Sequence, residues 1–194
     1  MLLRPFLNDA GSCASYLFGC TTHSKLAVVD AHVDLVDEYV AAAAAIGSPI
    51  VAVFETHVQA DHVSGLPALV ERTGATAYLP DGAGVEFEHA ALADGAVVAL
   101  GNTVVTAIAT PGHAPGHQSL AADLPESGRV VLCGDAAFTR ENLERGVIRA
   151  PDEAAAEESL AYIRSLVKDD LDRAFASHDM AAWSGWRSAP RTYR

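Results

Sequence analysis

The sequence predicts an α/β fold in which helices flank β-sheets, and three observations lead to this class. β-rich runs occur in both halves of the 194-residue chain, and helical segments alternate with them. No long linker, repeat or low-complexity tract divides the sequence, so we expect a single domain over residues 1–194. Strands mixed with helices along the whole chain favour sheets covered by helices over an all-β sandwich.

The first half is expected to contain four strands and two helices. SYLFGC and KLAVVDA are short strands around a polar connection. VDEYVAAAAAIG is helical, because alanine is the best helix former and Gly47 with Pro49 provides the stop. The continuous apolar run IVAVFETH fits a strand buried on both faces. DHVSGLPALVERTG returns to helix, ended by Gly74, and ATAYLP is the next strand.

The second half is expected to be a meander of strands that ends in a helix and a last strand. VVAL and TVVTAIAT flank a Gly-Asn pair, which is a strong hairpin signal. SLAADLP and RVVLCGDA are strands around the polar turn PESG. From Asp152 to Val167 runs an amphipathic helix with acids first and bases late, as the helix dipole prefers. Its apolar face consists of Ala156, Leu160, Ile163 and Val167, and RAFASHD is the last strand.

Composition limits the partners and the compartment. The net charge of −12 would repel phosphate backbones, so nucleic acid is not expected. No apolar run approaches the ~20 residues that cross a membrane, and the start has no secretory signal pattern. The cysteines at 13, 20 and 133 form no CxxC motif, which favours a reducing compartment. We expect a cytoplasmic protein with a small-molecule substrate. The sequence does not decide between a monomer and a homo-oligomer.

Histidines and carboxylates follow four of the expected strands. Loops at strand ends are where α/β enzymes place their chemistry. Each residue alone also fits a structural role, but their joint position at strand ends indicates a site. The candidates are His57, Asp61 and His62 after the first buried strand, then His113, Asp135 and His178 after three later strands.

These residues resemble the motifs of the metallo-β-lactamase superfamily. HxxxDH after a buried strand, then TPGH, GD and a late histidine, are similar to that family's HxHxDH and the three elements that follow it. The resemblance spans about residues 10–185 and implies an αββα sandwich with the site at one edge of the two sheets. Residues 12–120 resemble persulfide dioxygenases and glyoxalase II-like proteins, whereas residues 111–179 resemble N-acyl-homoserine lactonases.

The resemblance implies a set of metal ligands. One ion would be held by His57, the residue at 59 and His113, and a second by Asp61, His62 and His178, with Asp135 as the bridge. Gln59 stands where the family has a histidine, and an amide oxygen is a weaker, neutral ligand. Imidazole and carboxylate ligands suit zinc, iron or manganese. We expect one or two zinc ions, or iron(II).

Three functions follow from these ligands. The leading one is a metal-dependent hydrolase of a small ester, thioester or lactone, with metal-bound hydroxide as nucleophile and Asp61 and Asp135 as catalytic carboxylates. The first alternative is a mononuclear iron persulfide dioxygenase, because His57, His113 and Asp135 form the two-histidine, one-carboxylate pattern without residue 59. The second alternative is a non-catalytic member of the fold that binds a metal or ligand.

Three further expectations concern single residues. Phe138 stands where lactonases carry a tyrosine, so it is a candidate for the substrate pocket that lacks the hydroxyl donor. His117, in the second PGH, is interpreted as structural, with a supporting contact to a ligand as the alternative. His23, His32 and His89 are expected on the surface or in loops.

Overall fold

The computed structural model describes residues 2–8, 13–58, 62–124, 128–183 and 185. Its strands form two sheets, and each sheet comes from one half of the chain. The first sheet has the order β1-β2-β3-β4-β5-β6, with β1 Leu2–Asn8, β2 Cys13–Cys20, β3 Lys25–Val29, β4 Ile50–Phe54, β5 Thr76–Pro80 and β6 Ala90–Leu92. The second has the order β11-β10-β9-β8-β7, with β7 Val97–Leu100, β8 Thr103–Ala109, β9 Gln118–Leu124, β10 Gly128–Gly134 and β11 Ala174–Ala176.

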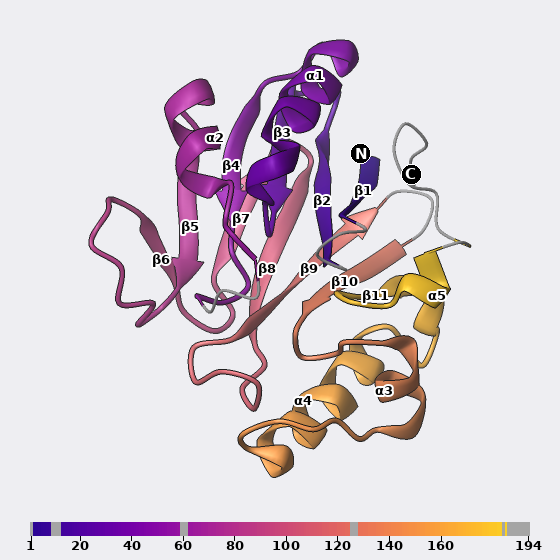
Figure 1. Cartoon of the computed structure of the whole chain (residues 1–194). Helices are drawn as coiled ribbons and strands as arrows, with labels where there is room; N and C mark the ends of the chain where they lie inside the picture. Colours follow the sequence, from indigo (N-terminus) through magenta and orange to yellow (C-terminus); the bar gives the residue numbers. More distant parts are fainter. Residues whose placement is uncertain (1, 9–12, 59–61, 125–127, 184, 186–194) are drawn as a thin grey trace.

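Helices cover the outer face of each sheet (Figure 1). α1 Val36–Ile46 and α2 Leu66–Thr73 pack on the first sheet, and α3 Arg140–Arg145 and α4 Glu153–Leu166 pack on the second. Short helices complete the chain at η1 Val33–Leu35, η2 Leu171–Arg173 and α5 Met180–Trp183. The fold is therefore an αββα sandwich, as the sequence predicted.

Alternation along β3 shows how the layers are built. Ala27 and Val29 point into the core between the sheets, and Leu26 and Val28 point into the core beneath α1 and α2. All four side chains are fully buried, because a strand in the middle layer has no solvent face. The same reason explains the continuous apolar run of β4, whose burial on both faces is confirmed.

Most expected elements are present, with some differences at their boundaries. The Gly-Asn hairpin is confirmed, because Leu100 pairs with Thr103 in an antiparallel ladder. The α4 face of Ala156, Leu160, Ile163 and Val167 is buried as predicted, and Asp152 caps the helix by accepting from the Ala155 amide.

The expected helix over 61–74 begins only at Leu66. Ser64 forms a strand-like bridge with His32, and a Cβ added at Gly65 would lie 2.9 Å from the His32 carbonyl oxygen. This close approach of two backbones holds the chain extended before the helix starts. His32 lies in the connection between β3 and η1, as one of the two sequence alternatives expected, but it is buried rather than on the surface, with 9% of its surface exposed.

No helix in the described ranges is both long and apolar enough to pass through a bilayer.

Candidate metal centre

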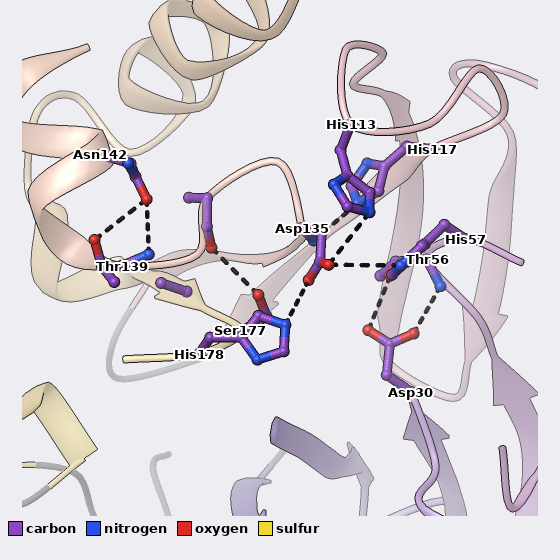
Figure 2. A network of polar contacts seen from close by, with 12 residues as sticks. Asp30, Thr56, His57, His113, His117, Asp135, Thr139, Asn142, Ser177 and His178 are labelled. Atoms are coloured by element: carbon purple, nitrogen blue, oxygen red, sulfur yellow. Dashed lines mark hydrogen bonds and ion pairs between the residues drawn. The ribbon is translucent and has the colours of Figure 1, made fainter. Parts of the chain in front are cut away.

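Four strand ends bring four of the candidate ligands together (Figure 2). His57 follows β4 of the first sheet, whereas His113, Asp135 and His178 follow β8, β10 and β11 of the second. A hydrogen bond joins the two sheets next to His57, because the backbone N–H of Gln118 donates to the Thr56 carbonyl at 2.8 Å. The site is therefore assembled across the interface between the sheets.

Asp135 lies at the centre of the site, and its two oxygens face different histidines. Oδ2 is 3.6 Å from Nε2 of His57 and 3.4 Å from Nε2 of His113. Oδ1 is 3.2 Å from Nε2 of His178. Among the described residues, His57, His113 and Asp135 form a group whose ligand atoms all lie within 4.8 Å of one another.

The ionisation of Asp135 suits a ligand role. Burial acts to raise the pKa of its carboxyl, but the hydrogen bond from His178 and the nearby His57 outweigh burial and hold the pKa below its usual range. Asp135 is therefore a buried carboxylate that faces three imidazoles. Nε2 of His57 is buried and makes no hydrogen bond with the described residues. A divalent cation between these groups would give that nitrogen the partner it lacks, so the donor set fits a metal.

A hydrogen-bonded chain orients His57. The Thr56 amide and hydroxyl both donate to Asp30, at 2.7 Å and 3.0 Å. Because its single hydrogen is used on Asp30, the Thr56 hydroxyl accepts from Nδ1 of His57, 3.0 Å away. The lone pair of His57 is then on Nε2, which faces Asp135.

His117 supports Asp135 rather than acting as a ligand. Its Nε2 accepts from the Asp135 amide at 2.9 Å, and its Nδ1 lies 2.9 Å from the Thr110 hydroxyl. Burial lowers the pKa of His117 to about 3, so the ring is neutral and can accept at Nε2. Both sequence interpretations of this residue therefore hold, because it is a buried structural histidine and it positions a candidate ligand.

Gly134 is required where β10 meets this site. Its φ is +52°, and an added Cβ would lie 2.5 Å from Oγ1 of Thr56 and 2.8 Å from Nε2 of His117. Only glycine combines this backbone conformation with such a close approach.

His62 lines an apolar pocket together with His57. Its ring stacks on His32 with 5.5 Å between centroids, and Glu55 also lines the pocket. Burial and the neighbouring Asp30 raise the pKa of Glu55 to about 8. Burial also raises the pKa of Asp30, but Asp30 differs from Glu55 in accepting two hydrogen bonds from Thr56, which oppose this rise.

Sequence reasoning missed Asp30 and Glu55, although both follow apolar strand runs as the known candidates do. Gln59 and Asp61 lie outside the described residues, so their predicted roles and that of His62 in a second metal site stay predictions. Phe138 lies beside the predicted ligands, with ring centroids 5.4 Å from His113 and 5.7 Å from His178.

The profile of the metallo-β-lactamase superfamily matches residues 8–178. The chain belongs to this superfamily. N-acyl homoserine lactonase AttM of Rhizobium radiobacter is 34% identical over 97 residues, which are 48% of this chain and 36% of that protein. N-acyl homoserine lactonase AiiA of Bacillus thuringiensis subsp. kurstaki is 39% identical over 82 residues, which are 42% of this chain and 33% of that protein. The matched region thus spans about a third of these curated relatives.

Three solved structures share the fold over nearly the whole chain. ETHE1 from Myxococcus xanthus has a TM-score of 0.75 at 24% identity, covering 100% of this chain and 79% of that one. A metallo-β-lactamase from Staphylococcus aureus has a TM-score of 0.74 at 23% identity, covering 99% of this chain and 59% of that one. A quorum-quenching N-acyl homoserine lactone lactonase has a TM-score of 0.66 at 21% identity, covering 93% of this chain and 85% of that one.

Proposed function

We propose that this chain is a metal-dependent hydrolase of a small ester, thioester or lactone. One observation carries the proposal: Oδ2 of Asp135 faces His57 and His113, and Oδ1 faces His178. A carboxylate whose two oxygens serve separate groups of imidazoles is placed to bridge two ions. The lactonase names of AttM and AiiA support hydrolysis of an ester-type bond as the reaction class.

The residues divide into two sets of donors. His57, His113 and Oδ2 of Asp135 would hold one ion, and His178 with Oδ1 would contribute to a second, to which we also assign Asp61 and His62. When bound, such ions polarise a substrate carbonyl and lower the pKa of a coordinated water to about 7. The chain itself holds the pKa of Asp135 below its usual range, and through Thr56 it holds the His57 tautomer whose lone pair is on Nε2.

A mononuclear iron dioxygenase acting on a persulfide is the second candidate. His57, His113 and Asp135 are two histidines and one carboxylate within 4.8 Å of one another, the pattern of non-haem iron oxygenases. Gln59 is compatible with this reaction, because residue 59 is not required in that triad.

Metal content of protein purified without added metal, together with two activity assays, separates the candidates. We expect one or two zinc ions per chain, turnover on an ester and thioester panel, and no oxygen uptake with glutathione persulfide. About one iron per chain with oxygen uptake would replace the hydrolase by the dioxygenase. Metal or ligand binding without turnover in either assay would leave a non-catalytic member of the fold.

Two variants make this test specific to the site. Asp135→Asn should abolish ester turnover and lower metal content, whereas Asp123→Asn, which alters an exposed aspartate paired with Arg129, should change neither. Gln59→His should raise occupancy of the first ion if the glutamine weakens that site. Unchanged occupancy would show that residue 59 is not a ligand.

A further inference from the structure

An apolar pocket of about 310 Å³ borders the candidate metal centre. Its walls come from the start of α2, the end of β5 and the segment before β6, together with described residues between β4 and α2. The apolar lining residues are Val58, Val63, Leu66, Pro67, Leu79, Val85 and Phe87. Several of them stay accessible, because Val58 and Phe87 are each 44% exposed and Val63 is 68% exposed. A pocket of this size, at the small end for ligand sites, fits a short chain or a small ring.

The pocket is continuous with the candidate donors, since His57 and His62 are also among its lining residues. A group seated against the apolar wall therefore lies next to His57, whose Nε2 faces Asp135. A larger hollow of about 420 Å³ near α3 and α4 does not border the candidate donors. Its lining is charged, with Glu141, Arg145 and Glu157 among the residues, and it contains none of the candidate ligands.

The described part of the pocket offers no permanently cationic side chain to pair with an anionic ligand. None of the 11 lining residues that the structure describes is lysine or arginine. One of them is Glu55, a carboxyl with only 6% of its surface exposed, which accepts from the Ser64 hydroxyl at 2.5 Å. A ligand carboxylate placed here would lose water without gaining a cationic partner, and burial of an unpaired charge is strongly unfavourable. The chain's net charge of −12 adds to this preference.

We infer that the pocket selects uncharged substrates with a short apolar acyl or alcohol portion, and rejects substrates that carry a carboxylate on that portion. Thioesters of peptide-like thiols with free carboxylates belong to the rejected class. This inference rests on the proposed hydrolase function and names its substrate class. Each added methylene should raise kcat/KM about fourfold until the pocket is filled.

The first test uses a matched pair of activated esters, 4-nitrophenyl butanoate and 4-nitrophenyl hemisuccinate. The two acyl chains have similar length, and only the second ends in a carboxylate. We expect kcat/KM to favour the butanoate by about tenfold or more, because the carboxylate enters the pocket unpaired. Equal values, or a preference for the hemisuccinate, would overturn the inference.

Phe87→Arg places a cation at this pocket and should narrow the butanoate preference severalfold. Its matched control is Val97→Arg, which makes the same charge change at a residue of β7 that is 60% exposed and does not line the pocket. We expect Val97→Arg to keep the wild-type ratio. A ratio that shifts equally in both variants would show a general charge effect and overturn the role of the pocket.

A binding measurement keeps the inference independent of turnover. Ligand-observed NMR with hexanamide should detect binding to the purified protein, and Phe87→Ala should weaken it severalfold by removing one wall. Hexanamide binding without ester hydrolysis would refute the proposed function and leave the pocket standing. Hydrolysis without chain-length preference or hexanamide binding would refute the pocket and leave the hydrolase standing.

Discussion

Thr56→Val tests whether the hydrogen-bonded chain behind His57 controls metal binding. The substitution keeps the size of a fully buried side chain but removes the hydroxyl between Asp30 and His57. Oδ2 of Asp30 loses its 3.0 Å donor, and Nδ1 of His57 loses its 3.0 Å acceptor. The His57 ring can then adopt either tautomer, and one of them carries the proton on the nitrogen that faces Asp135.

The structure sets the expected magnitudes. Loss of a partner that orients a metal-binding histidine typically lowers metal affinity about 10–100-fold, or about 1.4–2.8 kcal/mol. Two buried polar groups left without a partner should also destabilise the metal-free protein by about 2–4 kcal/mol. Chelator competition with zinc or cobalt measures the first quantity, and urea unfolding of the metal-free protein measures the second.

Thr103→Val is the matched control for this prediction. Its hydroxyl donates to the Asp123 carbonyl at 3.1 Å, and the residue is 6% exposed. Thr103 begins β8, whereas His113 follows the other end of that strand. We expect a destabilisation of about 1 kcal/mol and an unchanged metal affinity. If Thr56→Val binds metal within twofold of the wild type, the proposed control of the His57 tautomer is wrong.

Three further predictions follow from the same geometry. His117→Phe leaves the Asp135 amide and the Thr110 hydroxyl without their ring partner, so urea unfolding should show a loss of about 2–5 kcal/mol; a loss below 1 kcal/mol would contradict the support role. Gly134→Ala should cost about 2–5 kcal/mol through a positive φ and overlap with Thr56, whereas Gly47→Ala, at φ +74° with nothing within 4 Å, should cost only the backbone strain of about 1–2 kcal/mol. An equal loss of unfolding free energy in the two variants would show that close approach to Thr56 does not contribute. Burial raises the pKa of Tyr39 to about 12, so its contribution to stability is complete below pH 10 and is lost as pH rises from 10 toward 12, by about 1.4 kcal/mol per pH unit. Unfolding of wild type and Tyr39→Phe at pH 9–11 checks this, and parallel pH profiles would refute it.

The sequence predicted most of the fold because the middle-layer strands are apolar on both faces. β3, β4 and the hairpin of β7 and β8 are each identified by local pattern alone. β1 and β6 were missed for a physical reason: both are edge strands, β1 contains Pro5, and β6 has three residues. α3 has six residues, and its capping box of Thr139 and Asn142 is the local signal that could have identified it.

The site was predictable where the chain itself places a donor at a strand end. His57, His113 and Asp135 were identified in this way, and the structure brings them together. Asp30 was not identified, because its role depends on a hydrogen bond to Thr56, 26 residues away in sequence. The role of His117 likewise depends on the Asp135 amide, 18 residues away, so only the fold could reveal it. Local pattern identifies candidate ligands, whereas the groups that orient them are identified only from the three-dimensional contacts.

The division of the donors between the two sheets has a consequence for the chain as a whole. Residues 2–92 form the first sheet and supply His57 and the candidate His62, and residues 97–176 form the second sheet, after whose strands His113, Asp135 and His178 follow. Each half therefore lacks candidate ligands that the other half supplies. The affinity for an ion at this site should therefore depend on how closely the two sheets pack. A substitution in the core between the sheets should lower the metal affinity even though it contacts no candidate ligand.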